Sequence, residues 1–516
     1  MSVEPATSLR KITLFDTCSD TKRIFEPLEA GKVSMYVCGV TVYDLTHIGH
    51  ARVYIVFDVF RRFMRHLGYE VTYVRNHTDV DDKIIKRAAE KGQEPLALAE
   101  HFIGEFDRDM ATLGVAAADV EPKVSDHIAP IVAMVETLIE RGFAYESEGD
   151  VYFRVERFEE YGKLSGRKLV DMEAGRSGRV DDDEPSKKEH PFDFALWKSA
   201  KGDELSWPSP WGAGRPGWHI ECSAMATQYL GPRFDIHGGG RDLIFPHHEN
   251  EIAQSEAATG CTPFSNYWMH IGMVNVGEVS EDGARIERKM SKSLGNFWTT
   301  RDVLKGYHAE AVRYFMFTSN YRNPVTYSME NLEEASQRVE YLYTSLARID
   351  ETLARAGFGP GNPPPAAGWA EDRGALVEGF SERFDAALAD DLNTCRALAA
   401  IGELARAINE LTQSKKKPSA EAAHTLFAMR QRLTAAGGVL GILEKPPAAA
   451  LLELRDLRVD VLGLDAALIE QKVADREAAR AAKDWAGADA LRDELSAMNI
   501  EIMDSPEGTT WRVISN

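Results

Sequence analysis

The early part of the chain alternates short apolar runs with longer segments whose apolar residues recur at helical spacing. The run KVSMYVCG at residues 32–39 is apolar and β-branched, which predicts a buried strand, and residues 49–67 predict a helix that Gly68 ends. From Glu70 the run EVTYVRNHTDV predicts the next strand, and DDKIIKRAAEKG predicts the next helix. This order is typical of an α/β fold with a doubly wound parallel sheet.

Changes in composition divide the rest of the chain. Residues about 115–215 interrupt the alternation with a helical piece, a short strand pair and a charged loop, so we expect an insertion within a Rossmann-like catalytic domain over residues 1–330. The α/β pattern resumes near Trp218. Helical periodicity then predicts an α-helical domain over residues 331–445, and a helical part with a β-hairpin predicts a small C-terminal α+β domain over residues 446–516.

The chain is acidic, with 60 Lys and Arg against 81 Asp and Glu, which gives a formal net charge of −21. A phosphate backbone is repelled by such a chain on average, which excludes a sequence-indifferent polyanion binder but allows a local basic groove. The 5 cysteines are scattered and odd in number, so we expect a reducing cytoplasm rather than a disulfide framework. No apolar run of about eighteen residues predicts a membrane span.

The motif His47-Ile48-Gly49-His50 stands between the first predicted strand and the first predicted helix. A helix N-terminus presents unpaired N–H groups and a partial positive charge, which favour a phosphate anion. Gly49 would let a ligand approach the backbone, and the imidazoles of His47 and His50 could donate hydrogen bonds to phosphate oxygens. The same pattern is also compatible with two histidines in an ordinary loop.

A basic motif, KMSKSLGN, begins at Lys289 within a loop region over about 285–330. Lys289 and Lys292 with small hydroxyl residues are typical of a mobile loop that wraps a pyrophosphate, where each ammonium could stabilise charge on the leaving group. The alternative is a solvated basic turn. No G-x-x-x-x-G-K-[ST] or G-x-G-x-x-G precedes either motif, so this is neither a P-loop nor a dinucleotide-binding site.

The segment PHHENE begins with a proline suited to the first turn of a helix. From there His247 and Glu251 lie at i, i+4 on one face, the geometry that brings two ligands to one metal. We expect His248 and Glu249 to point elsewhere. A His/Glu pair of this kind is also common as a surface contact.

Two cysteines could complete a metal site with this pair. Cys38 ends the first predicted strand and Cys222 follows GWHIE in the resumed α/β region, and open α/β sheets bind ligands at the carboxyl ends of their strands. Together with His247 and Glu251 they would offer two thiolates, an imidazole and a carboxylate, which suit Zn²⁺. The long separation in sequence leaves this proximity an expectation.

Five segments in this order resemble the cysteinyl-tRNA synthetase family of class I aminoacyl-tRNA synthetases: CGVTVYDLTHIGHAR, NHTDVDDKII, GWHIECSAM, DIHGGGRDLIFPHHENEIAQSEA and KMSKSLGN. The resemblance covers nearly the whole chain, including the ending WAGADALRDELSAMNIEIMDSPEGTTWR. It implies a Rossmann-like catalytic domain with a connective insertion, a helical domain, and a C-terminal domain that reads the anticodon.

The resemblance also implies roles for individual residues. Zinc would be held by Cys38, Cys222, His247 and Glu251. ATP would be contacted by His47, Gly49, His50, Asp242 and Lys292. The catalytic residues would be His47, His50, Lys289 and Lys292, with the two lysines in one mobile loop. The amino acid would be surrounded by Gly39, Thr41, Thr78 and Trp218. One departure is His77, which stands where the family's NITD-type segment leads us to expect an apolar residue.

The activity implied is the ligation of L-cysteine to tRNA(Cys) in two steps. ATP, accompanied by Mg²⁺, and cysteine give cysteinyl-adenylate and pyrophosphate, and the cysteinyl group then passes to the 3′-terminal ribose with release of AMP. One Zn²⁺ per chain would select cysteine over serine, because coordination deprotonates a thiol of pKa roughly 8.5 but not a far less acidic alcohol. We expect a cytoplasmic monomer that binds neither membranes nor DNA.

Two other functions are compatible with parts of the sequence. The cysteine ligase of mycothiol biosynthesis resembles the catalytic half but passes the adenylate to an amino sugar, and a non-catalytic paralogue would bind RNA only. In the tail, six side chains could contact RNA or simply belong to a solvated helix and a core: Arg476, Arg480, Lys483, Arg492, Trp511 and Arg512.

Overall fold

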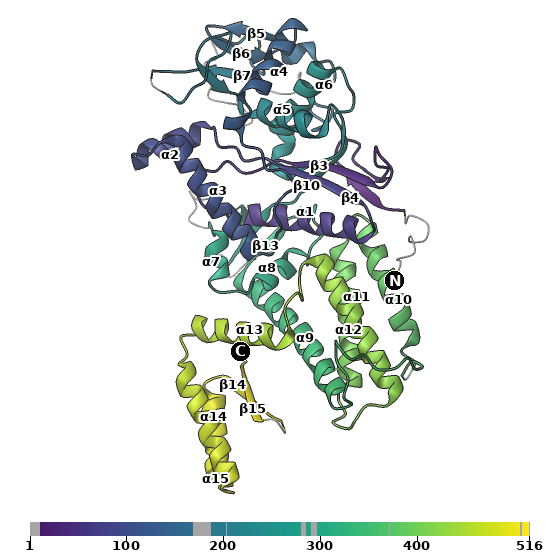
Figure 1. Cartoon of the computed structure of the whole chain (residues 1–516). Coiled ribbons are helices and arrows are strands. Elements are labelled where there is room, and N and C mark those ends of the chain that lie inside the picture. Colours follow the sequence, from purple (N-terminus) through teal and green to yellow (C-terminus); the bar gives the residue numbers. More distant parts are fainter. Residues whose placement is uncertain are drawn as a thin grey trace.

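The computed structural model describes residues 11–168, 187–202, 204–279, 285–289, 297–370, 372–505 and 508–514. In Figure 1 these residues run from an α/β region, through a group of helices, to a small C-terminal unit. None of the described helices is both long enough and apolar enough to cross a membrane.

A four-stranded parallel sheet forms the centre of the α/β region, in the order β10–β9–β3–β4. The middle strand β3 is buried on both faces: Met35 and Val37 belong to one hydrophobic core, and Tyr36 belongs to another. The predicted α/β class with a parallel sheet is confirmed. The strands are β3 (Lys32–Val37), β4 (Glu70–Arg75), β9 (Phe234–Gly240) and β10 (Ser265–Ile271).

Helices cover the two faces of this sheet (Figure 1). On one face α1 contacts β4, β9 and β10, and on the other α5 contacts β3 and packs against α6. The crossover helices place loops at the carboxyl edge of the sheet, where α/β proteins bind ligands. The helices are α1 (Ile48–His66), α2 (Asp82–Lys91), α3 (Pro95–Thr112), α5 (Trp218–Leu230) and α6 (Glu249–Thr259).

A second sheet, antiparallel and in the order β5–β6–β7–β8, lies between β4 and β9 in sequence. Its buried residues Phe153, Phe194 and Leu196 join the core of α5 and α6, so this sheet packs against the first region. These elements fall within the residues for which we expect an insertion. They are η1 (Val124–Asp126), α4 (Ile128–Glu140), β5 (Ala144–Ser147), β6 (Asp150–Phe153), η2 (Val155–Arg157), β7 (Phe194–Ser199) and β8 (Gly214–Pro216).

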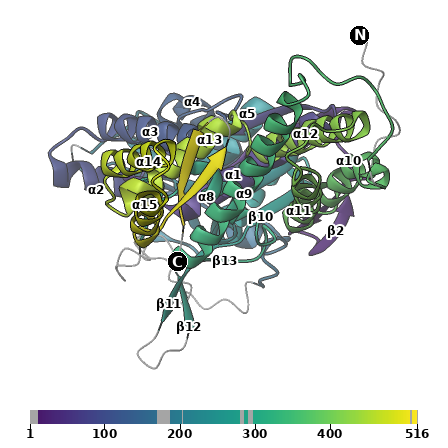
Figure 2. The same ribbon diagram turned by 90° about the horizontal axis from the view of Figure 1, so that it is seen from below.

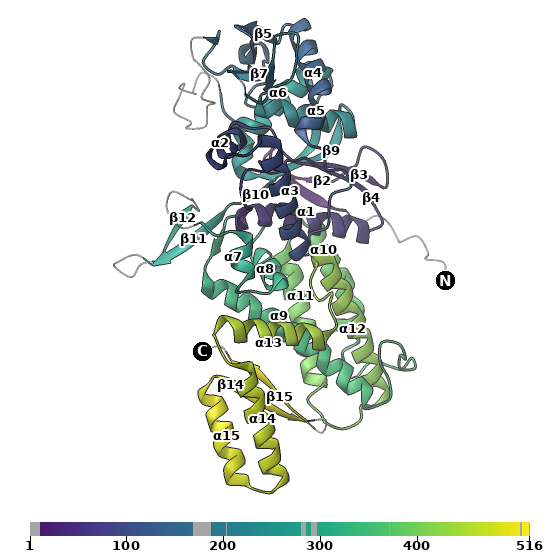
Figure 3. The same cartoon turned by 60° about the vertical axis from the view of Figure 1, so that its left-hand side comes forward.

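Two smaller sheets complete the α/β region. β1 and β2 form a hairpin, and β11 pairs antiparallel with β12 and parallel with β13. Figures 2 and 3 show the β11–β12 hairpin extending away from the body of the protein. The elements are β1 (Thr13–Asp16), β2 (Thr21–Ile24), β11 (Val274–Val279), β12 (Arg285–Lys289), α7 (Thr300–Leu304), α8 (Ala309–Met316) and β13 (Val325–Tyr327).

Helices follow, and a small α+β unit ends the chain. In that unit Trp511 is 4% exposed, packs with Ile469 and Leu495, and donates its indole N–H to Glu470. Trp511 could contact RNA or belong to a core, and the structure shows that it is a core residue. The elements are α9 (Met329–Ala354), α10 (Gly374–Ala389), α11 (Thr394–Leu411), α12 (Ala420–Leu440), α13 (Pro447–Val461), α14 (Ala466–Ala481), α15 (Trp485–Ala497), β14 (Ile500–Ser505) and β15 (Gly508–Val513).

A buried ionic contact joins the sheet region to the helices. Arg313 on α8 is 1% exposed and donates to Asp58 Oδ2 of α1 at 2.8 Å and to the Leu440 carbonyl at the end of α12. Burial opposes the charge on Asp58, but Arg313, Arg62 and Arg61 outweigh it and hold the pKa of Asp58 below its usual value. The contact fixes α1, α8 and α12 together.

Replacing Asp58 with Asn should destabilise the protein, because it leaves Arg313 buried without its counter-charge. We expect the free energy of unfolding to fall by about 3–5 kcal/mol in urea denaturation at neutral pH. Asp58 has a depressed folded-state pKa, so its contribution is complete above the unfolded-state pKa of about 3.9 and is lost as the pH falls through the folded value. The difference between the two proteins should therefore shrink in acid.

The matched control is Glu403→Gln, which removes an exposed pair with Arg383 and should cost less than about 1 kcal/mol. Equal losses of unfolding free energy in the two variants would show that the buried Asp58–Arg313 contact stabilises the protein no more than an exposed ion pair does.

Candidate active site and metal centre

Four side chains meet at the carboxyl edge of the parallel sheet. Cys38 follows β3, Cys222 lies on α5, and Glu251 lies on α6 just after the turn that carries His247. Cys38 Sγ lies 3.6 Å from Cys222 Sγ, 3.6 Å from His247 Nε2 and 3.3 Å from Glu251 Oε1. One ligand atom from each of the four lies within 4.8 Å of all the others, so the structure brings the four predicted zinc ligands together.

The ring of His247 is held by neighbours on its far side. It stacks on Trp218 with ring centroids 4.3 Å apart, and its Nδ1 lies 2.9 Å from His219 Nδ1. Nε2 faces Glu251 Oε1 at 3.0 Å, as the i, i+4 spacing predicts. A histidine that ligates a metal through one ring nitrogen is usually oriented by a hydrogen bond at the other, which is the position that His219 occupies here.

The charge of Glu251 is compensated by neighbouring imidazoles, one of them within this group and one outside it. Glu251 is 0% exposed, and although burial opposes its ionisation, His237 and His247 hold its pKa well below the usual value. Burial raises the pKa of the Cys38 thiol well above its usual range, whereas the contact with Cys38 lowers the pKa of Cys222 to about 6 against the effect of burial. Thiols, imidazole and carboxylate at these distances are the donor set of a zinc ion.

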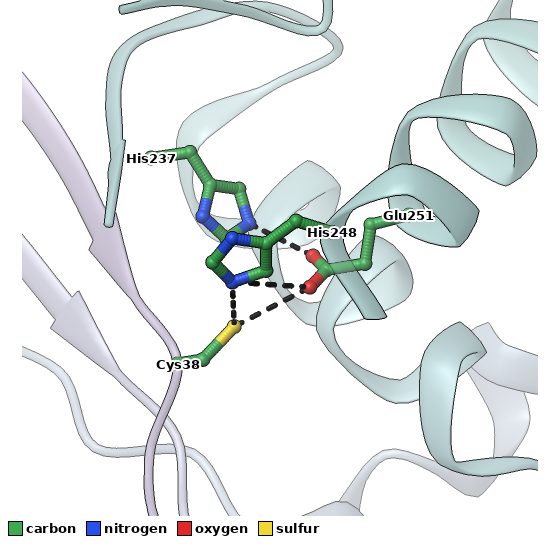
Figure 4. A group of neighbouring side chains, drawn as sticks. All are labelled: Cys38, His237, His248 and Glu251. Carbon is green, nitrogen blue, oxygen red and sulfur yellow. Dashed lines mark hydrogen bonds and ion pairs between the residues drawn. The ribbon is translucent and has the colours of Figure 1, made fainter. Parts of the chain in front are cut away.

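A second group shares two of these residues. Figure 4 shows His237 and His248 beside Cys38 and Glu251, and the four ligand atoms lie within 4.8 Å of one another. His237 Nε2 lies 2.8 Å from Glu251 Oε2, and His248 Nε2 lies 3.3 Å from Cys38 Sγ. The prediction that His248 points elsewhere is therefore wrong. His248 has helical backbone angles and precedes Glu251 by three residues, so the two side chains share a face of the helical segment.

Glu249, in contrast, does point elsewhere: its Oε1 accepts the Gly162 amide at 3.0 Å and its Oε2 accepts the Ser165 amide at 2.8 Å. Sequence reasoning missed His237 altogether. It lies in the middle of β9, and its one signal was a histidine within a buried strand, just before the glycines of DIHGGG.

The first histidine of the HIGH motif caps α1. His47 is the N-cap residue, and its Nδ1 accepts the amides of Gly49 at 3.0 Å and His50 at 3.3 Å. The rings of His47 and His50 stack with centroids 3.6 Å apart. A Cβ on Gly49 would lie 2.8 Å from the His47 ring, so this glycine makes room for the imidazole rather than only for a ligand.

The second motif lies mostly outside the described residues. Lys289 ends β12, where its backbone pairs with Asn275, but its side chain and residues 290–296, including Lys292, are outside the description. The chain returns beside the first motif: Thr299 bridges His47, and the Ile48 amide donates to the Trp298 carbonyl at 3.2 Å. Both ends of the KMSKS segment are thus fixed, one of them at the N-terminus of α1.

The residues expected around the amino acid border the four-residue group. The Gly39 amide donates to Asn76 Oδ1 at 2.8 Å, Thr41 bridges Thr78, and Thr78 Oγ1 donates to the buried Glu221 at 3.3 Å. Trp218 stacks on His247, and Asp242 lies in the turn Arg241–Leu243 after β9. Asn76 and Glu221 were not predicted; Asn76 opens the NHTD segment and Glu221 immediately precedes Cys222.

Known proteins match the chain along most of its length. The family model described as tRNA synthetases class I (C) catalytic domain matches residues 24–337, a DALR domain model matches 383–444, and a cysteinyl-tRNA ligase anticodon binding domain model matches 469–512. Cysteine–tRNA ligase of Geobacter sulfurreducens is 48% identical over 97% of this chain and 99% of its own length. The chain belongs to the cysteine–tRNA ligase family.

Further relatives agree with this family. Cysteine–tRNA ligase of Geobacter metallireducens is 50% identical over 97% of this chain and 99% of its own length. The Mycobacterium tuberculosis methionyl-tRNA synthetase solved with methionyl-adenylate has a TM-score of 0.60, covers 84% of this chain and 94% of its own, and shares 18% identity, so it supports the class I fold alone. As a cysteine–tRNA ligase, the enzyme uses ATP to ligate cysteine to tRNA(Cys).

A methyl group on Gly39 should disturb the segment that we expect to contact the cysteine substrate. A Cβ built there would lie 1.6 Å from the Asn76 carbonyl oxygen, so β3 and the NHTD segment must move apart. We expect Gly39→Ala to weaken cysteine binding at least tenfold in calorimetry, since a displacement near 1 Å disrupts a positioned site. The control Gly104→Ala meets nothing within 4 Å in α3 and should bind cysteine normally; equal behaviour of the two variants would contradict the close fit.

Proposed function

We propose that the ligase selects cysteine through a Zn²⁺ ion held by Cys38, Cys222, His247 and Glu251. The proposal rests on one observation above all: two thiols, an imidazole and a carboxylate lie buried within 4.8 Å of one another at the carboxyl edge of the sheet. Their donor atoms fit zinc in kind and number. When bound, the ion would stabilise the thiolate of substrate cysteine, which the hydroxyl of serine cannot match.

The side chains around this group supply orientation. His219 holds the ring of His247 through Nδ1, and Trp218 covers the face of the same ring. His237 contacts the second oxygen of Glu251, so the first oxygen is left toward Cys38 and His247. The shape of a pocket alone gives a difference in binding free energy between cysteine and serine of only about 1–3 kcal/mol. A metal that binds the thiolate adds to this difference, so a separate editing domain is unnecessary.

Replacing Cys38 with Ser should remove both the metal and the preference for cysteine. We expect the zinc content to fall well below one ion per chain, and cysteine affinity measured by calorimetry to approach that for serine. His247→Ala should behave alike, because it removes another ligand. The control is Cys395→Ser, an exposed cysteine on α11 that should change neither quantity. A Cys38→Ser protein that keeps its metal and still prefers cysteine would contradict the proposal.

We propose further that the HIGH and KMSKS residues stabilise charge during adenylate formation. The cysteine carboxylate attacks the ATP α-phosphate and pyrophosphate leaves, so negative charge grows on phosphate oxygens. With Nδ1 of His47 accepting two amides, Nε2 carries the proton and is the donor toward ATP. His50 stacks beside it, Asp242 would contact the nucleotide, and Lys289 and Lys292 would hold the pyrophosphate together with Mg²⁺.

Replacing Lys292 with Ala should slow adenylate formation without weakening cysteine binding. We expect cysteine-dependent ATP–pyrophosphate exchange to fall by about 10²–10³-fold, the usual cost of losing one charge-stabilising donor, while calorimetry with cysteine is unchanged. Lys305→Ala is the control, because Lys305 is an exposed lysine paired with Asp302 after α7. Equal losses in exchange rate and cysteine affinity for Lys292→Ala would contradict a leaving-group role.

We propose the domain boundaries 1–330, 331–445 and 446–516, with the connective insertion at about 115–215, and we propose that the enzyme acts as a cytoplasmic monomer that does not bind DNA. The anticodon-binding match at residues 469–512 supports tRNA, rather than an amino sugar, as the acceptor. The transfer step then places the cysteinyl group on the terminal ribose of tRNA(Cys), for which the 2′-OH is the expected nucleophile in a class I enzyme.

A further inference from the structure

The imidazole ring of His77 is buried, although the backbone amide of this residue donates to the Pro122 carbonyl. His77 follows β4, is 2% exposed, and within the described part of the chain neither of its ring nitrogens has a partner. Its ring packs edge-on against Phe106, with centroids 5.5 Å apart. Burying an imidazole unpaired is costly, and the adenylation and zinc chemistry above make no use of this residue.

Two carboxylates lie beside this imidazole. A ring nitrogen of His77 and carboxylate oxygens of Asp107 and Glu121 all lie within 4.8 Å of one another. Asp107 is exposed on α3, and Glu121 is half-buried in the loop before η1. Ligands bound at about 2.0–2.2 Å to one ion lie roughly 3–4 Å apart, so small side-chain rotations would bring these three atoms to a common ion.

We propose that His77, Asp107 and Glu121 form a second metal site, separate from the cysteine-containing group, for a divalent transition-metal ion such as Zn²⁺. Imidazole and carboxylate oxygens are suitable ligands for such an ion, and water would fill its remaining positions. The exposed Asp107 gives the ion a route from solvent. A bound ion would satisfy the unpaired imidazole.

Arg75 is one charge that competes with a cation here. Its Nη2 contacts Glu121 Oε1, which also accepts the Ala118 amide at 3.0 Å, so the other oxygen of Glu121 is the one directed to the ion. The guanidinium lies over the Phe106 ring at 4.6 Å.

Lys123 is a second nearby cation, and its ion-pair partner Glu100 is a third carboxylate. Three carboxylates against two cations leave the surroundings of His77 with a net negative charge, which favours a cation.

A metal at this site would stabilise the segment that carries His77. His77 lies between Asn76, which accepts the Gly39 amide, and Thr78, which donates to Glu221. An ion held by His77 and Asp107 would tie this segment to α3. Metal bound here should therefore raise the midpoint of thermal unfolding.

The test is Zn²⁺ binding to enzyme whose cysteine-containing group has already been filled with one equivalent of zinc. Isothermal titration calorimetry should detect a second Zn²⁺ per chain, accompanied by a higher unfolding midpoint. His77→Val, which restores an apolar residue, and Asp107→Asn, which alters an exposed carboxylate, should each weaken this second event at least tenfold and abolish the midpoint shift. The matched control is His101→Val, an exposed histidine on the same α3, which should bind as the wild type does.

Three results would overturn the site. One is the absence of a second binding event in the wild type, and another is a wild-type isotherm for either His77→Val or Asp107→Asn. The third is an equal loss in His101→Val, which would assign the event to surface histidines in general. Asp107→Asn keeps the test decisive if His77→Val folds poorly, because Asp107 is exposed. None of these results bears on zinc at Cys38, since that group is filled beforehand.

Discussion

The candidate metal centre depends on one constraint, which is the burial of Glu251. Its carboxylate is 0% exposed and lies 2.8 Å from His237, 3.0 Å from His247 and 3.3 Å from Cys38. A buried carboxylate without partners would cost several kcal/mol, so strands β3 and β9 and the turn before α6 must all deliver a side chain to one point. The parallel sheet makes this possible, because the carboxyl ends of these two strands are neighbours.

Regular periodicity made part of this arrangement predictable. The alternation of strands and helices gave the α/β class, and the i, i+4 spacing placed His247 and Glu251 on one side of a helical segment, where they contact each other. Cys38 could be assigned to the same edge because it ends a strand. Cys222 follows no such rule; its place in the resumed α/β region made it a candidate, and the family resemblance supported its assignment to the group.

The remaining contacts depend on local geometry that periodicity does not encode. His248 has helical backbone angles and lies at i, i+3 to Glu251, which brings both to one face, and its contact with Cys38 on another element is one that spacing within a single helix does not reveal. The role of His47 as an N-cap was equally hidden, since a histidine is an uncommon cap and only the structure places its Nδ1 against two amides. Both misses concern side-chain direction within a correctly predicted element.

The availability of the arginines in the C-terminal tail likewise depends on contacts that the sequence pattern does not reveal. A chain with a net charge of −21 can bind a polyanion only where its cations are not already engaged. Arg476 and Arg480 of α14 both contact Asp504 of β14 and so hold the C-terminal hairpin to this helix, whereas Arg512 of β15 contacts Glu501 of β14 within the hairpin. Residue type alone could not separate such structural cations from those that face RNA. Each such internal pair offsets a positive charge that would otherwise be available to a phosphate.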